Sequence, residues 1–579
     1  MSDATTPHGS TERTPAPSGP HPTGQPTSQG GPPPGPFGPD GHPRRWAILA
    51  VLVVSLLIVV LDNTVLNIAL PTIQRDLDAT QSELVWAIDA YVLVFAALLF
   101  TWGVLGDRYG RKRILLIGLA IFAAGSALSA VAASPGQLIT FRAIMGIGGA
   151  AVIPVTLAII TVVFPPRERG RAIGAWAGAV GGAVALGPVL GGLLLENPQW
   201  FSWLIGNDYG SVFLINVPIV LIGMIGITRL VPETRNPNPQ RLDVAGLLLS
   251  FVGLTAIVYG IIHAGDTKDW AAPSVLVPVV GGLMVVALFV FLEARSDHPS
   301  FDVSLFLNRG YTISLVAVSL AFFALSGVTF TFPFYLQTLR GYSTLLAGVS
   351  FLPFAVGQLL GAPRSAALVA RFGERTVITS GLALVAVSLL YLTRLELGTA
   401  LWAVLLAFFG FGLGMGTVIA PASTVMQNTL PLNRAGAGSA VQNTVRQVFG
   451  AFGVAVVGTV LANQYTDKLA PTLAALPPHV PQAAKDALSS TVAAVPEVLG
   501  RAQQQGTPVP VIQNVRSAAF SAFIEASHVA TWLSAAMMIL AAVIVAVGLP
   551  KIVTLDPAPG AGSSRTVVPD EVTAPIARD

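Results

Sequence analysis

The chain contains no cysteine among its 579 residues. Disulfide bonds, thiolate metal sites and cysteine nucleophiles are therefore excluded. Charged residues are scarce, at 11% of the chain, whereas a typical soluble domain carries about 25%. The sequence also lacks a phosphate-binding Gly-Lys-Ser/Thr loop, paired metal ligands and a nucleophile elbow. We therefore expect no enzyme, no metal site and no cofactor, and the small net charge of +3 gives no indication of nucleic-acid binding.

Apolar residues are abundant instead, at 53% of the chain. Apolar runs of about twenty residues recur from Trp46 to Leu549, and this is the length that crosses a bilayer core of roughly 30 Å. The sequence predicts an all-α polytopic membrane protein with fourteen transmembrane helices. The predicted spans are 46–70, 84–106, 114–133, 136–163, 172–195, 211–229, 244–263, 271–292, 311–338, 345–369, 376–394, 399–427, 436–462 and 529–550.

Polar segments lie at both ends of the chain and before the last span. Residues 1–43 are mostly Pro, Gly, Ser, Thr, Gln and His, so we expect a disordered tail, and a second tail over 553–579. A long external loop is predicted at about 463–528, in which stretches such as 481–499 can form surface helices.

Loop charges predict the orientation in the membrane. An even number of spans puts both termini on one side, and one set of loops carries nearly all the cations. The opposite short loops offer only Arg75, Lys268, Arg340 and Arg394. By the positive-inside rule the cation-rich side, with both termini, is cytoplasmic. Its residues are Arg44, Arg45, Arg108, Arg111, Lys112, Arg113, Arg167, Arg169, Arg171, Arg229, Arg235, Arg241, Arg295, Arg309, Arg371, Arg375, Arg434 and Lys551.

An internal repeat divides the spans. Residues 106–112, after the second span, match 369–375, after the tenth. Glycine runs at 146–149 and 412–416 are each followed by a proline. Related halves are typical of secondary transporters, whose substrate site lies between them. We predict an N-terminal six-helix bundle over 44–230, an inserted helix pair with flanking loops over 231–310, and a C-terminal six-helix bundle over 311–552.

Four stretches resemble the major facilitator superfamily, and within it the fourteen-helix drug:proton antiporter family. They are 61–71 in the first span, 103–113 after the second, 187–192 in the fifth and 438–447 in the thirteenth. The antiporter motif of the family usually opens with a further glycine, where this chain has Ala183. The resemblance covers roughly residues 44–550 and implies the major facilitator fold.

The resemblance also implies a function. It predicts a proton-coupled antiporter that exports lipophilic or cationic drugs and antibiotics across the cytoplasmic membrane by alternating access, as in multidrug efflux and antibiotic resistance. A proton gradient would take the place of a cofactor. The expected partners are a small substrate, protons and the lipid bilayer, with no nucleic acid, and the expected state is a monomer. A proton-linked uptake permease of the same fold is the alternative.

Two motifs gain roles from the resemblance. Gly103, Asp107, Arg108, Gly110 and Arg111 match a motif that acts as a cytoplasmic gate, although the same cations can simply fix the topology. The antiporter motif comprises Gly187, Pro188, Gly191 and Gly192. Its proline should bend the helix, and its glycines permit close helix contact, with or without a conformational role.

Three ionisable residues lie inside predicted spans, where each is costly unless it is paired or hydrated. Counting about 1.5 Å per residue, Asp62 lies about 13 Å, Arg142 about 10 Å and Asp89 about 8 Å from the outer end. Their similar depths are compatible with one shared cavity. Aligning the two halves puts Phe408 or Phe409 at the position of Arg142, so only the first half buries a guanidinium.

We therefore predict that Asp62 and Arg142 couple transport to protons, because a carboxylate beside a permanently charged Arg can alternate between a proton and an ion pair. Asp62, Asp89 and Asn67 are the predicted substrate-binding residues. A static ion pair between Asp62 and Arg142 is the simpler alternative. The sequence leaves open whether Asp62 or Asp89 is the main protonation site.

Overall fold

The computed structural model describes residue 37 and residues 40–201, 203–236, 243–267, 269–296, 303–430, 435–477 and 480–550. The tail predicted over 553–579 and most of the tail predicted over 1–43 lie outside these residues, as do the predicted loop cations Arg241, Lys268, Arg434 and Lys551. The described part of the chain is helical and contains no strand. Fourteen helices in it are long and apolar enough to cross a membrane, which confirms the predicted all-α polytopic fold.

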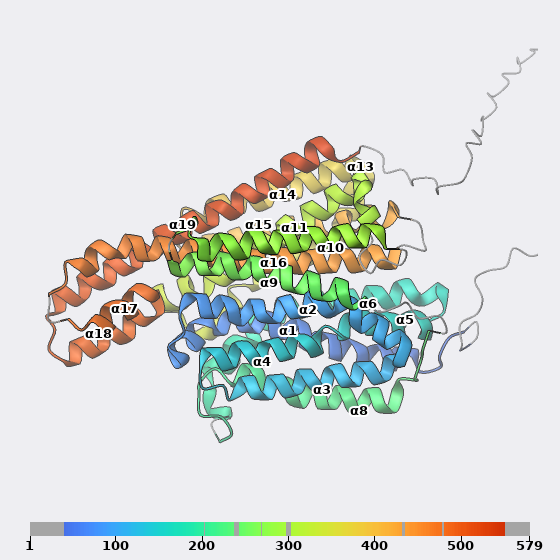
Figure 1. Ribbon diagram of the computed structural model, residues 1–579, viewed down its shortest axis with the longest axis horizontal. Helices are drawn as coiled ribbons and strands as arrows, with labels where there is room; N and C mark the ends of the chain where they lie inside the picture. Colours follow the sequence, from blue (N-terminus) through green and yellow to red (C-terminus); the bar gives the residue numbers. More distant parts are fainter. Residues whose placement is uncertain are drawn as a thin grey trace, which may run out of the picture.

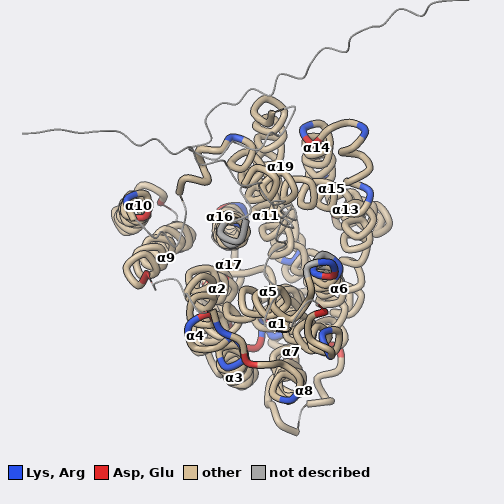
Figure 2. Tube along the Cα trace, turned by 90° about the vertical axis from the view of Figure 1, so that its right-hand side faces the viewer, with Lys and Arg blue, Asp and Glu red and all other residues tan. Residues whose placement is uncertain are grey.

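The helices of the N-terminal half form one group in cross-section (Figure 2). Several single spans of the sequence prediction are built from two helices in succession. The elements are α1 (Arg45–Leu77), α2 (Gln81–Tyr109), α3 (Arg111–Ala130), α4 (Pro135–Gly149), α5 (Val152–Val163), α6 (Pro166–Glu196), η1 (Pro198–Trp200), α7 (Ser211–Leu214) and α8 (Asn216–Leu230).

The C-terminal half packs beside the first, with the helix axes roughly parallel (Figure 1). Its elements are η2 (Val303–Leu307), α11 (Arg309–Phe334), η3 (Tyr335–Leu339), α12 (Thr344–Val349), α13 (Leu352–Phe372), α14 (Glu374–Leu392), α15 (Leu401–Asn428), α16 (Ala435–Ala474), α17 (Gln482–Ser490), η4 (Val492–Ala494), α18 (Val495–Gln504) and α19 (Val509–Gly548).

Prolines explain the broken spans. The breaks between α4 and α5, α7 and α8, and α12 and α13 each come shortly before a proline, at Pro154, Pro218 and Pro353 respectively. A proline has no N–H for the carbonyl one turn earlier, and its ring clashes with that carbonyl. The hydropathy of each span stays continuous across the break, so the sequence predicts one span where the backbone forms two segments.

The inserted pair consists of α9 (Val244–Thr267) and α10 (Pro273–Arg295). These two helices pack against each other and lie to one side of the two bundles, next to α2 and α16 (Figure 2). Leu248, Val252 and Met284 on the pair are more than half exposed, as expected for side chains that face lipid.

The segment predicted as an external loop at 463–528 is largely helical. Helix α16 continues to Ala474, and α19 already begins at Val509. Both extend past the bundle beside α17 and α18 (Figure 1). The Tyr465 hydroxyl donates a hydrogen bond to the Leu488 carbonyl (2.9 Å), which ties the extension of α16 to α17. Hydropathy marks where a span leaves the apolar layer, but an Ala- and Gln-rich sequence can continue a helix beyond that point.

Paired glycines reproduce the internal repeat in three dimensions. A Cβ added at Gly148 of α4 would lie 2.3 Å from the Gly118 carbonyl of α3. In the other half a Cβ at Gly414 of α15 would lie 2.7 Å from the Gly381 carbonyl of α14. If Gly148 is equivalent to Gly414, Arg142 is equivalent to Phe408 and not to Phe409. Arg142 precedes Gly148 by six residues, and Phe408 precedes Gly414 by six residues.

The two halves meet at one end of the bundle. There, the Gln337 side-chain amide donates to the Ile68 carbonyl, and the Thr344 hydroxyl donates to the Gly192 carbonyl, both at 2.9 Å. At the other end one face of the first half of α6 is open, since a Cβ added at Gly174, Gly181 or Gly182 would meet nothing within 4 Å. We call these the closed end and the arginine-rich end. The second carries the N-terminus of α1 and the start of α6, which Arg45 and Glu168 join by an ion pair (2.8 Å).

Candidate functional site

Asp62 and Arg142 form an ion pair inside the N-terminal half. The Asp62 carboxylate comes from the middle of α1, and the Arg142 guanidinium from α4, where its Nη1 contacts Oδ2 of Asp62. Their side chains are 1% and 0% exposed. Both charges are thus removed from solvent, and each is compensated by the other, as buried charges in a membrane protein require.

Neighbouring groups fix the geometry of this pair. Nε of Arg142 donates to the Ala87 carbonyl of α2 (3.1 Å), and the guanidinium carbon lies 4.4 Å from the centre of the Tyr91 ring. The Asn216 side-chain amide donates to Oδ1 of Asp62 (3.0 Å). The same amide lies 3.1 Å from the Ser126 hydroxyl. Helices α1, α4 and α8 therefore meet at the Asp62 carboxylate, and α2 contacts its partner Arg142, so a change in the charge of Asp62 can alter the packing of all four.

The pair is not saturated with hydrogen bonds. Among the described residues, Nη2 of Arg142 is buried and has no acceptor. A guanidinium carries five N–H donors, and only part of this capacity is used here. The remaining donor is available to a water molecule or to a polar group of a substrate.

Asp89 does not join this pair. It lies on α2, is 0% exposed, and neither carboxylate oxygen has a hydrogen-bond partner within the described part of the chain. A buried carboxylate in this setting costs free energy unless it is protonated or meets a cation. The structure thus brings together two of the three ionisable residues that the sequence places at similar depth, and leaves the third separate.

Asn67 is half-buried on α1, and its side-chain amide donates to the Asn63 carbonyl one turn earlier (3.1 Å). This bond stays within the helix. The role of Asn67 in substrate binding remains a prediction.

The equivalent position in the C-terminal half is apolar. Phe408 of α15 is 1% exposed, and its ring centre lies 4.3 Å from that of Phe332 and 5.3 Å from that of Phe351. In the repeat, Phe408 of this aromatic cluster has the position that Arg142 has in the first half. Only one half therefore carries a buried charge pair at this position.

The predicted gate motif lies at the arginine-rich end. Arg111 at the start of α3 pairs with Asp107 at the end of α2 (2.7 Å). Asp107 also accepts a hydrogen bond from the Asn236 side-chain amide (3.3 Å), and the Arg111 amide donates to the Thr234 carbonyl (2.9 Å). The motif thus holds the segment after α8, which leads to the inserted pair.

The remaining gate residues support the turn between α2 and α3. Gly110 has φ +116° and lies so close to Glu233 that an added Cβ would be 2.6 Å from its Oε1. Gly103 faces Pro154 of α5, and Arg108 is exposed beside the Tyr109 ring. The role of this motif as a cytoplasmic gate stays a prediction.

The predicted antiporter motif lies where the two halves meet. On one side, a Cβ at Gly187 would lie 1.8 Å from the Thr64 hydroxyl of α1, and one at Gly191 would lie 3.0 Å from Val65. On the other side, a Cβ at Gly192 would lie 2.4 Å from the Thr344 carbonyl of α12. The Pro188 carbonyl faces Gly348 of α12 at a similarly short distance. The motif therefore forms the contact surface of the closed end.

Two members of the ion-pair site were missed in the sequence. Asn216 is an amide within an otherwise apolar run, so its position gave a signal that could have been used. Tyr91 gave none, since an aromatic residue in an apolar span is most often simple packing. Its contact with Arg142 depends on how α2 and α4 cross, and Gly146 of α4 permits this crossing by lying against the Tyr91 carbonyl.

Comparisons with known proteins agree with this architecture. Residues 52–454 match the Major Facilitator Superfamily. The chain is 37% identical to the puromycin resistance protein pur8 of Streptomyces alboniger over 73% of this chain and 82% of that protein. It is 34% identical to the multidrug efflux pump LfrA of Mycolicibacterium smegmatis, over 86% of this chain and 95% of that protein. It is 31% identical to the methyl viologen resistance protein SmvA of Salmonella typhimurium (strain LT2), over 86% of this chain and 97% of that protein.

Solved structures share the fold. A bacterial homologue of the human lysosomal transporter Spinster superposes with a TM-score of 0.62 at 15% identity, over 87% of this chain and 96% of that one. A D-xylose–proton symporter gives a TM-score of 0.54 at 16% identity, over 87% and 98%. With the match over residues 52–454, the fourteen membrane helices and the paired halves, the chain belongs to the major facilitator superfamily of membrane transporters.

Proposed function

We propose that this protein exports lipophilic or cationic drugs in exchange for protons, by alternating access between its two halves. Three relatives named above are a drug-resistance protein, a multidrug efflux pump and a methyl viologen resistance protein, which supports drugs as the substrate class. The observation that carries proton coupling is the buried pair of Asp62 and Arg142, in which the position of Arg142 corresponds to Phe408 in the C-terminal half.

The pair offers a way to couple a proton to conformation. Arg142 stays charged under all relevant conditions, whereas Asp62 can be ionised or neutral. When Asp62 takes a proton, its attraction to Arg142 and its hydrogen bond from Asn216 both weaken. Because α1, α4 and α8 meet at this carboxylate and α2 contacts Arg142, neutralisation of Asp62 would change the contacts that hold these helices together.

The orientation in the membrane decides which side the closed end faces. We assign the arginine-rich end to the cytoplasm by the positive-inside rule. In this proposal the observed contacts correspond to a state closed towards the outside, with the ion pair intact. In the opposite state, which is open towards the outside, a proton would bind Asp62 and the drug would leave, and deprotonation on the inside would restore the drug site. The same rule places both termini in the cytoplasm.

Asp89 supports a cationic substrate. It is a carboxylate buried without a hydrogen-bond partner among the described residues, and it lies on the helix that also contributes Ala87 and Tyr91 to the ion-pair site. A bound organic cation would compensate its charge. Asp62 would then respond mainly to protons, and Asp89 mainly to the drug.

The test uses purified protein in liposomes with an imposed pH gradient, where dye uptake and proton flux are recorded together. We expect Asp62→Asn and Arg142→Ala to abolish gradient-driven exchange. Asp76→Asn serves as a matched control, since Asp76 is on the same helix but pairs with Arg75 outside the site (3.4 Å). Exchange that persists in both site variants would refute the coupling proposal. Co-transport of dye and protons in the same direction would favour the uptake permease.

A further inference from the structure

Arg446 is a second guanidinium inside a membrane span, and the proposed mechanism does not use it. It lies on α16 of the C-terminal half, eleven residues after the helix begins, which is about 17 Å along the helix axis. Its guanidinium carbon lies 4.8 Å from the centre of the Phe322 ring, in the middle of α11. An Arg near a helix end usually extends its charge to the membrane surface. The charge of Arg446 instead lies beside the middle of a neighbouring span.

Close packing between α11 and α16 fixes the direction of this side chain. A Cβ added at Gly450 would lie 3.2 Å from the Ser326 hydroxyl of α11, and one at Gly453 would lie 2.2 Å from the Phe323 carbonyl. Gly450 comes one turn after Arg446, and residues one turn apart share a face of the helix. Arg446 therefore faces α11.

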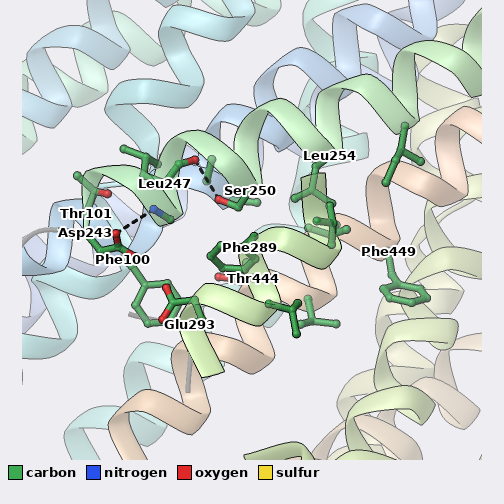
Figure 3. A pocket seen from close by; sticks show the side chains of 18 of the residues that line it. Phe100, Thr101, Asp243, Leu247, Ser250, Leu254, Phe289, Glu293, Thr444 and Phe449 are labelled. Carbon is green, nitrogen blue, oxygen red and sulfur yellow. Dashed lines mark hydrogen bonds between the residues drawn. The ribbon is translucent and has the colours of Figure 1, made fainter. Parts of the chain in front are cut away.

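The other side of α16 lines a cavity. Thr444, Val445 and Val448 contribute to this cavity of about 310 Å³, which lies beneath the inserted pair, between α2, α9, α10 and α16 (Figure 3). Arg446 is not among the residues that line it. Besides α11 of its own half, α16 packs against α2 of the other half. Arg446 thus points away from the inserted pair, on a helix at the boundary between the halves, where secondary transporters bind their substrates.

No acidic residue compensates Arg446 in the described part of the chain. Its Nε is buried without an acceptor, and the residue takes part in no ion pair there. Helices α11, α13 and α15 contain no Asp or Glu, and the only one in α16 is Asp467, twenty-one residues further on. Gln442, one turn before Arg446, donates from its side-chain amide to the Ser423 hydroxyl (2.7 Å). The Arg446 residue as a whole is half-buried, so a ligand can reach the charge.

Asp89 on the neighbouring α2 is not a partner of Arg446. A Cβ added at Gly458 of α16 would lie 2.7 Å from Val85 of α2, and the two helices run in opposite directions. From this contact, Asp89 is four residues along α2 and Arg446 is twelve residues back along α16, so the two lie about 12 Å apart along the axis. This separation is too long for an ion pair, but a drug-sized molecule can extend from one charge to the other.

We propose that Arg446 binds an acidic group of the transported compound, such as a carboxylate, and that the substrates include amphoteric molecules whose cationic end lies near Asp89. A guanidinium matches a carboxylate with two parallel hydrogen bonds, and the attraction is stronger where water is excluded. The proposal rests on the export function for the identity of the ligand as a substrate. A lipid phosphate has similar chemistry, but it belongs at the membrane surface, whereas Arg446 lies beside the middle of α11.

The experiment measures binding without any gradient. Purified full-length protein in nanodiscs of phosphatidylcholine is titrated with rhodamine B, which carries a cation and a free carboxylate, and with rhodamine B ethyl ester, in which the carboxylate is masked. Fluorescence anisotropy gives the affinities. We expect Arg446→Gln to weaken rhodamine B binding about tenfold by removing a charge-assisted contact, and to leave ester binding unchanged. Arg446→Lys, which keeps the charge but not the paired geometry, should recover part of the affinity.

Arg364→Gln is the matched control. Arg364 is in a span of the same half, but it is exposed and donates to the Leu360 carbonyl one turn earlier (3.0 Å), so its loss should change neither affinity. Equal losses for both dyes in Arg446→Gln, with a lower unfolding temperature, would mean that Arg446 only supports the packing of α11 and α16. That result, or an unchanged affinity for rhodamine B, would overturn the proposal. So would phosphatidylglycerol that displaces rhodamine B but not its ester, because Arg446 would then be a lipid site.

Asp89→Asn separates this inference from the proposed function. Both dyes carry the cation, so this variant should weaken the binding of both. Unchanged affinities would refute the cation contact at Asp89, whereas Arg446→Gln alone decides the carboxylate contact. Since no gradient is applied, neither result depends on whether Asp62 couples protons.

Discussion

The two halves of this transporter use the same helix packing around different chemistry. In both halves, glycines let two helices approach each other closely. These are Gly118 of α3 with Gly148 of α4 in the first half, and Gly381 of α14 with Gly414 of α15 in the second. Six residues before the second glycine of each pair, the first half has Arg142 paired with Asp62, whereas the second has Phe408 in an aromatic cluster. The glycine packing is the same in both halves, but this position holds a charged residue only in the first half.

This difference indicates which half can change its charge state when it binds a proton. An aromatic cluster has a single charge state, and its packing is insensitive to protons. A buried ion pair has two states, because its carboxylate can be neutralised. We therefore expect the first half to respond to protons, and the second to provide a surface of constant charge for the substrate.

The largest effect is expected from Arg142→Ala. The substitution leaves the Asp62 carboxylate buried without its cation, which costs roughly 3–5 kcal/mol of stability. Transport should fall by about a hundredfold or more. Proteoliposome flux and thermal unfolding in detergent measure the two effects.

A double variant tests the cause of this loss. Asp62→Asn combined with Arg142→Ala removes the uncompensated charge, so it should regain much of the stability lost in Arg142→Ala while remaining unable to exchange protons. If the double variant is no more stable than Arg142→Ala, the loss does not arise from the orphaned carboxylate.

The second prediction imposes the chemistry of one half on the other. Phe408→Arg puts a guanidinium among the rings of Phe332 and Phe351, neither of which can form an ion pair with it. We expect a severe loss of folded protein, as for other unpaired charges inside membranes. Phe408→Leu should cost only about 1–2 kcal/mol and keep the proton dependence of transport. The yield of monodisperse protein and the pH dependence of flux measure both. Loss of proton dependence in Phe408→Leu would contradict the division of roles.

The third prediction concerns the surface that holds the halves together. Gly192→Ala places a methyl group against the Thr344 carbonyl, so it should weaken the closed end by about 1–3 kcal/mol, whereas Gly181→Ala faces open space. The chain has no native cysteine, so a single reporter, Gln337→Cys, can be labelled in each background. We expect labelling from the closed end to speed up about tenfold with Gly192→Ala and to stay unchanged with Gly181→Ala. Equal rates in the two backgrounds would show that this contact does not limit opening.

The smallest effect distinguishes the two equivalent turns. Gly110 and Gly373 both have positive φ, at +116° and +79°. Alanine at either position should cost about 1 kcal/mol of backbone strain. Only at Gly110 would the methyl group also meet Glu233, so Gly110→Ala should be the more destabilising by about 1 kcal/mol. Thermal unfolding of the two variants in detergent provides the comparison. Equal losses of stability in the two variants would mean that the segment at Glu233 moves away from the added methyl group without a cost in free energy.

Much of the architecture could be predicted from residues alone. The spans follow from apolar runs of membrane length, and the division into two halves and an inserted pair follows from the repeated turn at Gly110 and Gly373. The helix breaks before Pro154, Pro218 and Pro353 could have been read from the prolines. The ends of α16 and α19 could not be predicted in this way. Hydropathy indicates which residues lie in the apolar layer of the membrane, and a helix can extend beyond that layer.

The site was predicted in part. Asp62 and Arg142 stood out because ionisable residues inside apolar spans are costly, and similar depth made a contact plausible. Similar depth says nothing about the direction in which each side chain points, so Asp89 was grouped with them although it lies apart. Glu293 lies just past the predicted span 271–292, and its burial depends on the position of α10 against α9.

The sequence by itself determined that this protein crosses a membrane fourteen times, which residues are buried at cost, and that the two halves are related. These properties depend on composition and order along the chain, since each span must satisfy its own backbone hydrogen bonds in lipid. Only the tertiary structure decided which charges meet, that the antiporter motif forms the contact between the halves, and that a cavity lies under the inserted pair. These depend on helix rotation and crossing, which are set by close contacts between residues far apart in sequence.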